Sequence, residues 1–113
     1  MGSMNSSLKM SPQSIQDMKA IVDPKIDQNK VMVFSKSYCP YCSSAKSALK
    51  DLGVDFSVVE LDQVNNGSDI QSYLYEITGQ RTVPNIFIKK AHVGGCDDLL
   101  RKIRSGEIQK MLE

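Results

Sequence analysis

The stretch of sequence that decides the fold is VMVFSKSYCPYC, residues 31–42. It begins with four apolar residues, Val31 to Phe34, which are rich in β-branched and aromatic side chains and typical of a strand buried on both faces. It ends on two cysteines, Cys39 and Cys42, with Pro40 at the position that favours the first turn of a helix. The sequence therefore predicts a buried strand that runs into a cysteine-bearing turn at the start of a helix.

The segments that follow this stretch predict a mixed α/β sheet. Apolar residues continue at helical spacing as far as Gly53, and the β-rich segment 56–61 comes next, so the pattern indicates a parallel βαβ unit with a right-handed crossover. The β-rich run 85–88 lies too close to residues 92–95 for a crossover helix between them. These two runs therefore predict an antiparallel hairpin, which makes the sheet mixed.

Capping residues predict four further helices, two of them with a predicted end. The first should end near Val22, because Asp23-Pro24 interrupts the helical pattern. The second should end at Thr78-Gly79, where glycine favours a helix stop. The predicted helix starts are Ser11-Pro12, Ser68, Asp97 and Ser105-Gly106-Glu107.

Length and composition predict one ordinary folded domain. The 113 residues are 41% hydrophobic and 24% charged, with a formal net charge of +1 and no block of like charge, so nucleic-acid binding is not expected. No apolar run approaches the roughly 20 residues that span a membrane. We expect a disordered tail at residues 1–10 and one domain over residues 11–113. Met1-Gly2-Ser3 is interpreted as an expression scar rather than a myristoylation signal, and a trimmed N-terminus would leave an organellar targeting segment open.

The three cysteines point to redox chemistry rather than to structural disulfides. An odd number of cysteines in a short chain does not fit a secreted disulfide framework, which favours a reducing compartment, and we expect the cytoplasm. A zinc site is the alternative explanation of the pair. It needs four ligands, and beyond Cys39 and Cys42 the chain offers only Cys96 and its sole histidine, His92. Redox chemistry is therefore the preferred interpretation, and we expect no metal.

The two cysteines of the cysteine turn, defined as residues 36–42, should have different roles. Cys39 falls at the expected helix N-cap, where free backbone amides and the nearby Lys36 favour the thiolate and can lower a cysteine pKa to about 3.5–7.5. Cys42 lies one turn further along and should be shielded by the helix. We therefore expect Cys39 to be the nucleophile and Cys42 the resolving thiol.

Three motifs together resemble the glutaredoxin family, in its dithiol branch: Cys39-Pro40-Tyr41-Cys42, Thr82-Val83-Pro84, and Gly94-Gly95-Cys96-Asp97-Asp98. The resemblance implies a thioredoxin-like fold, a central four-stranded mixed sheet flanked by helices. It also implies a glutathione-dependent oxidoreductase that reduces glutathione mixed disulfides and some protein disulfides, with glutathione as reductant. An iron–sulfur cluster carrier with glutathione as co-ligand is the alternative function within the family.

The resemblance also implies a glutathione groove. In it, Lys36 and Gln71 would bind the glycyl carboxylate, Val83 of a cis-proline loop would bind the cysteinyl part through its backbone, and Cys96-Asp97 would receive the γ-glutamyl end. For Gln71, a capping box with Ser68 is an equal alternative. His92 is interpreted as structural or exposed. The expected glutathione-binding residues are Lys36, Tyr41, Gln71, Thr82, Val83, Pro84, Gly95, Cys96 and Asp97.

The expected partners follow from the same resemblance. They are glutathione, glutathionylated and disulfide-containing proteins, and, indirectly through glutathione, glutathione reductase. No nucleic-acid or membrane partner is expected, and the chain is expected to be a monomer.

Overall fold

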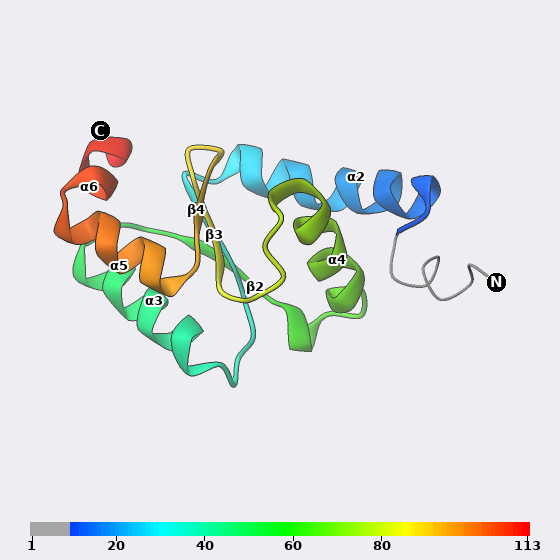
Figure 1. Ribbon diagram of the computed structural model, residues 1–113, viewed down its shortest axis with the longest axis horizontal. Coiled ribbons are helices and arrows are strands. Elements are labelled where there is room, and N and C mark those ends of the chain that lie inside the picture. Colours follow the sequence, from blue (N-terminus) through cyan, green and yellow to red (C-terminus); the bar gives the residue numbers. More distant parts are fainter. Residues whose placement is uncertain (1–9) are drawn as a thin grey trace.

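The protein is described by a computed structural model over residues 10–113 (Figure 1). The predicted tail comprises residues 1–10. Residues 1–9 lie outside the described range, and Met10 is partly buried and packs against the core. Within the described residues, no helix is both long enough and apolar enough to cross a membrane. The elements, in chain order, are α2 (Pro12–Gln28), β1 (Val31–Ser35), α3 (Pro40–Asp51), β2 (Ser57–Glu60), the 3₁₀ turn η1 (Leu61–Gln63), α4 (Gly67–Thr78), β3 (Asn85–Ile88), β4 (Ala91–Gly94), α5 (Cys96–Arg104) and α6 (Glu107–Leu112).

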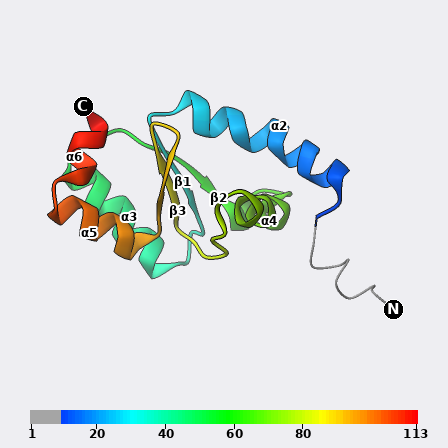
Figure 2. The ribbon, with the colours of Figure 1, turned by 45° about the horizontal axis from the view of Figure 1, so that its top comes forward.

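The four strands form one mixed sheet in the order β2-β1-β3-β4. Figure 2, in which β1, β2 and β3 are labelled, shows the strands between α2 and α4 on one side and α3, α5 and α6 on the other. β1 pairs in parallel with β2, and Ser35 at the end of β1 lies opposite Glu60. β3 is antiparallel to both β1 and β4. The sheet confirms the predicted mixed topology and places the end of β1, with the cysteine turn, at one edge of the molecule.

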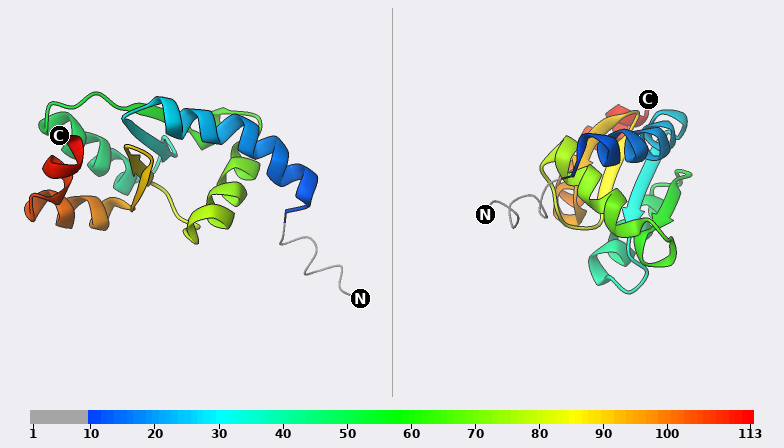
Figure 3. Two further views of the ribbon diagram at one scale, coloured as in Figure 1. Left: turned by 90° about the horizontal axis from the view of Figure 1, so that it is seen from above. Right: turned by 90° about the vertical axis from the view of Figure 1, so that its right-hand side faces the viewer.

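Helices cover both faces of the sheet, so the strands are buried on both sides (Figures 1 and 3). Met32 and Phe34 of β1 belong to the hydrophobic cluster that includes side chains of α2 and α4. Val31 and Val33 belong to a second cluster with side chains of α3, α5 and α6. Alternate residues of a strand point to opposite faces, which explains why an unbroken apolar run was needed here.

The first helix is longer than predicted, because α2 passes through Pro24 and ends at Gln28. Proline in a helix interior removes a hydrogen bond and costs roughly 3 kcal/mol. Ile26, beyond the proline, is buried in the core, and burying such a side chain contributes roughly 1.5–3 kcal/mol. Asp23 also accepts a hydrogen bond from the hydroxyl of Tyr73 on α4, at 2.7 Å. These tertiary contacts offset the local cost, so the predicted end near Val22 is wrong.

The predicted caps of α4 and α5 are also wrong. Ser68 lies inside the first turn of α4, whose N-cap is Asn66. The helix begins at Gly67, where a Cβ atom would lie 1.8 Å from the carbonyl oxygen of Leu61. Only glycine therefore permits this close packing of α4 on η1.

At the start of α5 the N-cap is Gly95, and Asp97 lies within the helix. The capping carboxylate comes from Asp98, whose Oδ2 accepts a hydrogen bond from the Gly95 N–H at 3.1 Å. The predicted N-cap Asp97 therefore lies two residues after the observed one, and the residue whose side chain closes the capping box is Asp98, the third residue of the helix.

Candidate active site

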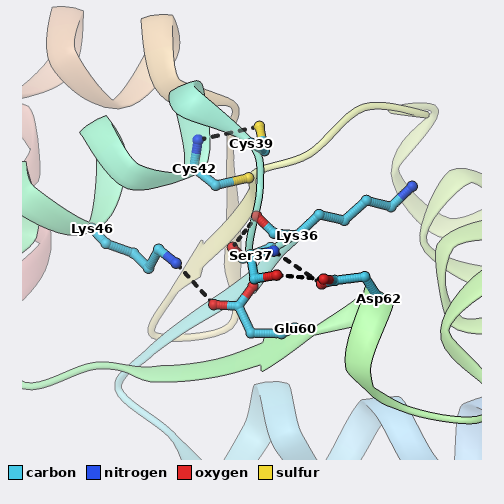
Figure 4. Close-up of polar contacts among 8 residues, drawn as sticks. Lys36, Ser37, Cys39, Cys42, Lys46, Glu60 and Asp62 are labelled. Carbon is cyan, nitrogen blue, oxygen red and sulfur yellow. Dashed lines mark hydrogen bonds and ion pairs between the residues drawn. The ribbon is translucent and has the colours of Figure 1, made fainter.

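Cys39 is held at the start of α3 by short-range backbone geometry, as predicted. It is the N-cap residue, with Pro40 in the first helical position, and its Sγ accepts a hydrogen bond from the N–H of Cys42 at 3.4 Å (Figure 4). Its own N–H donates to the carbonyl of Lys36 at 3.1 Å. Cys39 is half-buried, whereas Cys42 is fully buried. An outside disulfide can therefore reach Cys39 but not Cys42.

The two thiols have pKa values shifted in opposite directions. Burial raises the pKa of Cys39, but hydrogen bonds from the Cys42 thiol and from the backbone N–H groups of Cys42 and Tyr41 outweigh it, so the pKa lies below its ordinary value. For Cys42, burial dominates and raises the pKa, and the neighbouring Cys39 raises it further. This difference favours Cys39 as the thiolate of the pair, because the thiolate is the nucleophilic form.

The cation that assists Cys39 is Lys46 and not the predicted Lys36. The positive charge of Lys46, two turns along α3, adds to the lowering of the Cys39 pKa. Its Nζ lies 2.8 Å from Oε2 of Glu60 on β2, and both side chains are mostly buried. The side chain of Lys36 instead extends away from Cys39 in Figure 4. Its charge adds slightly to the lowering of the Asp62 pKa, which comes mainly from the hydrogen bonds of Ser37. Lys36 follows the end of β1 and Lys46 lies on α3, so spacing along the chain could not reveal which of the two charges acts on Cys39.

The carboxylate of Asp62 binds the cysteine turn to η1, the 3₁₀ turn that follows β2. Asp62 in η1 accepts hydrogen bonds from both the N–H and the hydroxyl of Ser37, the first at 2.9 Å (Figure 4). These contacts join segments that are 25 residues apart in the chain. The turn therefore has a fixed attachment immediately before Cys39.

A cavity of about 400 Å³ opens beside Cys39. The peptide bond between Val83 and Pro84 is cis, as the family resemblance implied. The Val83 carbonyl oxygen lies 3.8 Å from Cys39 Sγ. The lining combines three segments that are distant in sequence: Tyr41 after the nucleophile, residues 80–84, and the first turn of α5. The lining residues are Tyr41, Gln80, Thr82, Val83, Pro84, Gly95, Cys96, Asp97 and Asp98.

Seven of the nine predicted glutathione-binding residues line this cavity, and two do not. Gln71 lines a second hollow of about 400 Å³, with Tyr75 and Arg81 among its neighbours. Its Nε2 donates to the carbonyl of Arg81 at 2.8 Å. The alternative capping box with Ser68 does not form, because the N-cap of α4 is Asn66 and no side chain caps it. Lys36 lies outside the lining of both hollows.

Two lining residues, Gln80 and Asp98, were missed by the sequence analysis. Asp98 could have been found, because it follows Asp97 in the same motif and either carboxylate suits a helix N-terminus. Gln80 carries no such signal. It follows the glycine that ends α4, and its side chain donates hydrogen bonds to the carbonyls of Thr82 and Pro84 because the chain folds back at these residues.

The four side chains of the alternative zinc site do not gather. Among residues 10–113, no group of three or more His, Cys, Asp or Glu side chains is placed to hold a metal ion. His92 on β4 contacts Oδ1 of the buried Asn85 at 2.9 Å, which agrees with the structural interpretation of this histidine. Burial, Asp97 and Cys39 raise the pKa of Cys96, so this cavity-lining thiol is held in its neutral form.

Known proteins are similar to this chain in sequence and in fold. The family model described as Glutaredoxin matches residues 31–93. Glutaredoxin-1 of Rhizophagus irregularis is 52% identical over 98 residues, which cover 87% of this chain and 97% of the relative. Glutaredoxin-C1 of Arabidopsis thaliana is 43% identical over 112 residues, covering 99% and 90%. The crystal structure of a buckwheat glutaredoxin–glutathione complex matches with a TM-score of 0.87 at 40% identity, covering 91% and 94%.

Proposed function

The chain belongs to the glutaredoxin family of thiol oxidoreductases, and from this premise we propose that it removes glutathione from mixed disulfides and reduces some protein disulfides. Glutathione is the proposed reductant and co-substrate. The buckwheat relative, which shares this fold, forms a complex with glutathione. The cavity beside Cys39 offers a place for the same tripeptide here.

Removal of glutathione needs only one cysteine of the enzyme. The Cys39 thiolate attacks the glutathione sulfur of a mixed disulfide, the substrate thiolate leaves and takes up a proton, and a disulfide forms between Cys39 and glutathione. The thiolate of a second glutathione then attacks the bound glutathione sulfur. Glutathione disulfide is released and the Cys39 thiolate is restored. The net reaction reduces the substrate to its thiol and joins one free glutathione to the glutathionyl group that came from the substrate.

Reduction of a protein disulfide requires Cys42 as well. Cys39 attacks one sulfur of the substrate and forms a mixed disulfide, while the other substrate sulfur leaves as a thiol. Cys42 loses its proton and attacks Cys39 Sγ, which releases the second substrate thiol and forms a Cys39–Cys42 disulfide. Two glutathione molecules then reduce this disulfide and become glutathione disulfide. The buried position of Cys42 supports this internal role.

The observation that carries the proposal is the placement of Cys39 between a helix N-terminus and the cavity. Its sulfur accepts a backbone N–H from α3 and lies 3.8 Å from the Val83 carbonyl on the cavity wall. A disulfide in the cavity can therefore approach a sulfur whose pKa is already lowered. The carboxylates of glutathione suit two further groups, namely the amides at the start of α5 and the cation Lys36.

The proposed binding residues remain the nine named from the sequence. Tyr41, Thr82, Val83, Pro84, Gly95, Cys96 and Asp97 form the cavity wall, and Lys36 and Gln71 are proposed for the glycyl end of glutathione. We further propose that the protein works as a monomer in the cytoplasm, where a reducing environment keeps its three free cysteines available.

The direct test is turnover of a small mixed disulfide of glutathione. The purified protein, reduced glutathione and glutathione reductase with its nicotinamide reductant are mixed, and consumption of that reductant reports the glutathione disulfide formed. We expect turnover that depends on glutathione and is absent from Cys39→Ser. A rate equal to that of the buffer alone would contradict the proposed function. The alternative of an iron–sulfur carrier predicts visible absorption after anaerobic purification, whereas the proposed enzyme is colourless.

A further inference from the structure

Gln80 lines the cavity, and its side chain binds the backbone of the same wall. Its Nε2 donates hydrogen bonds to two carbonyl oxygens, that of Thr82 at 3.0 Å and that of Pro84 at 2.9 Å. These residues stand immediately before and after Val83. The amide of Gln80 therefore binds the backbone on both sides of Val83, whose carbonyl oxygen lies 3.8 Å from Cys39 Sγ.

The other end of Gln80 is anchored to α4. Its backbone N–H donates to the hydroxyl of Thr78 at 3.0 Å, and that hydroxyl donates to the carbonyl of Leu74 inside the helix at 2.7 Å. Gly79, in the left-handed conformation with φ of 77°, ends the helix and turns the chain toward the cavity. Gln80 is thus bound both to the end of α4 and to residues 82 and 84; we call residues 80–84 the proline loop.

The contacts of Gln80 determine which backbone groups the proline loop presents. With the Thr82 and Pro84 carbonyls directed to the amide of Gln80, the Val83 carbonyl is the one that faces Cys39 Sγ, at 3.8 Å. The same amide passes close to α5, since a Cβ atom added at Gly95 would lie 3.9 Å from Gln80 Nε2. The side chain of Gln80 therefore binds the backbone around Val83 and lies near the start of α5.

We propose that Gln80 is a positioning residue that orients the backbone of Val83 toward the sulfur and main chain of the glutathionyl substrate. The inference rests on the proposed function, because it concerns the same cavity. Gln80 makes no bond in the reaction and acts through Val83. Loss of its two hydrogen bonds should weaken substrate binding and leave the Cys39 thiolate unaffected, since the groups that lower the Cys39 pKa all belong to α3.

The decisive variant is Gln80→Glu, which keeps the size of the side chain but replaces the donor by a carboxylate facing two carbonyl oxygens. We expect the KM for a glutathionylated substrate to rise about tenfold, the scale of one or two lost hydrogen bonds, with kcat within about twofold. Gln80→Ala should raise KM similarly. It also provides the test if the glutamate variant does not fold.

Two further measurements separate positioning from general stability. Alkylation of Cys39 by iodoacetamide, a small reagent that does not need Val83, should keep its rate and pH profile in both variants. Gln109→Ala is the matched control, because Gln109 on α6 also donates from Nε2 to a backbone carbonyl, that of Ile103 on α5, and neither residue lines the cavity. It should leave KM unchanged even if it lowers the melting temperature.

The outcomes distinguish the inference from the proposed function. A wild-type protein with no turnover would overturn the proposed function itself. A wild-type protein with normal turnover whose KM is unchanged in both Gln80 variants would overturn only the role of Gln80. The same holds if the Gln80 variants change KM no more than Gln109→Ala does, or if they slow alkylation of Cys39 as strongly as turnover.

Discussion

The cysteine turn and the proline loop face each other across the same short gap but are built in different ways. Within the turn and the start of α3, Cys39 makes hydrogen bonds with Lys36, Cys42 and Ser43, which lie three or four residues away along the chain. The proline loop has no regular secondary structure and meets Cys39 from 44 residues away. The comparison teaches that the reactivity of the nucleophile is a local property of a helix start, whereas its access to substrate depends on the whole sheet.

The largest effect should come from the nucleophile of the cysteine turn. Cys39→Ser should abolish both removal of glutathione and reduction of protein disulfides, because a hydroxyl cannot supply a comparable nucleophile at neutral pH. Both activities are measured on a variant shown to be folded by circular dichroism. Activity clearly above the background of either assay would show that the nucleophile lies elsewhere.

Cys42→Ser should divide the two activities. The variant should retain, or even increase, removal of glutathione, because this reaction needs only Cys39 and free glutathione and the lost Cys42 can no longer divert the intermediate. It should lose reduction of protein disulfides, where an internal thiol must release the trapped substrate. The two assays are run at equal glutathione concentration, and loss of both activities together would contradict the assignment of Cys42 as the resolving thiol.

Lys36→Ala tests whether the cysteine turn contributes to glutathione binding as well as to reactivity. We expect the KM for glutathione to rise about two- to fivefold, the effect of one exposed charge contact, while the pH profile of Cys39 alkylation stays the same. Lys50→Ala, which removes an exposed lysine from the end of α3, is the control and should change neither. Unchanged kinetics in Lys36→Ala would remove this residue from the site.

The lowered pKa of Cys39 is tested by the pH dependence of its alkylation. Because the pKa of Cys39 is lowered, its alkylation should stay fast below the ordinary cysteine value of about 8.5 and decline only as the pH falls through the lowered pKa. Lys46→Gln removes a positive charge that favours the thiolate, so the midpoint should move to higher pH. A wild-type midpoint near 8.5, or a variant midpoint that moves downward, would contradict this electrostatic account.

The smallest functional effect is expected far from both regions, at Pro24 in α2. Pro24→Ala restores a helix hydrogen bond but gains flexibility in the unfolded chain, so the free energy of unfolding should rise by about 1–2 kcal/mol. Urea denaturation measures the change, and KM and the alkylation profile should not move. A lower stability would show that the proline ring itself packs usefully in α2.

The sequence alone determined the features that depend on short-range periodicity and capping. An unbroken apolar run predicted the central strand β1, and Cys39 before Pro40 predicted the N-cap of α3. The hairpin of β3 and β4 followed from the short distance between them. These features could be predicted because the physical causes act within a few residues: side-chain alternation, orphan amides at a helix start, and limited loop length.

Other features were decided only by the tertiary structure. α2 continues through Pro24 because Ile26 and Asp23 find partners in the core and on α4. Lys46, and not Lys36, which is nearer in sequence, lowers the pKa of Cys39. Lys46 lies on α3, whereas the side chain of Lys36 extends away from Cys39 (Figure 4). Gln80 joins the cavity because the fold brings its amide to two carbonyls and close to α5. In each case the deciding contact lies across elements, where packing free energy outweighs local preference and spacing along the chain carries no information about direction.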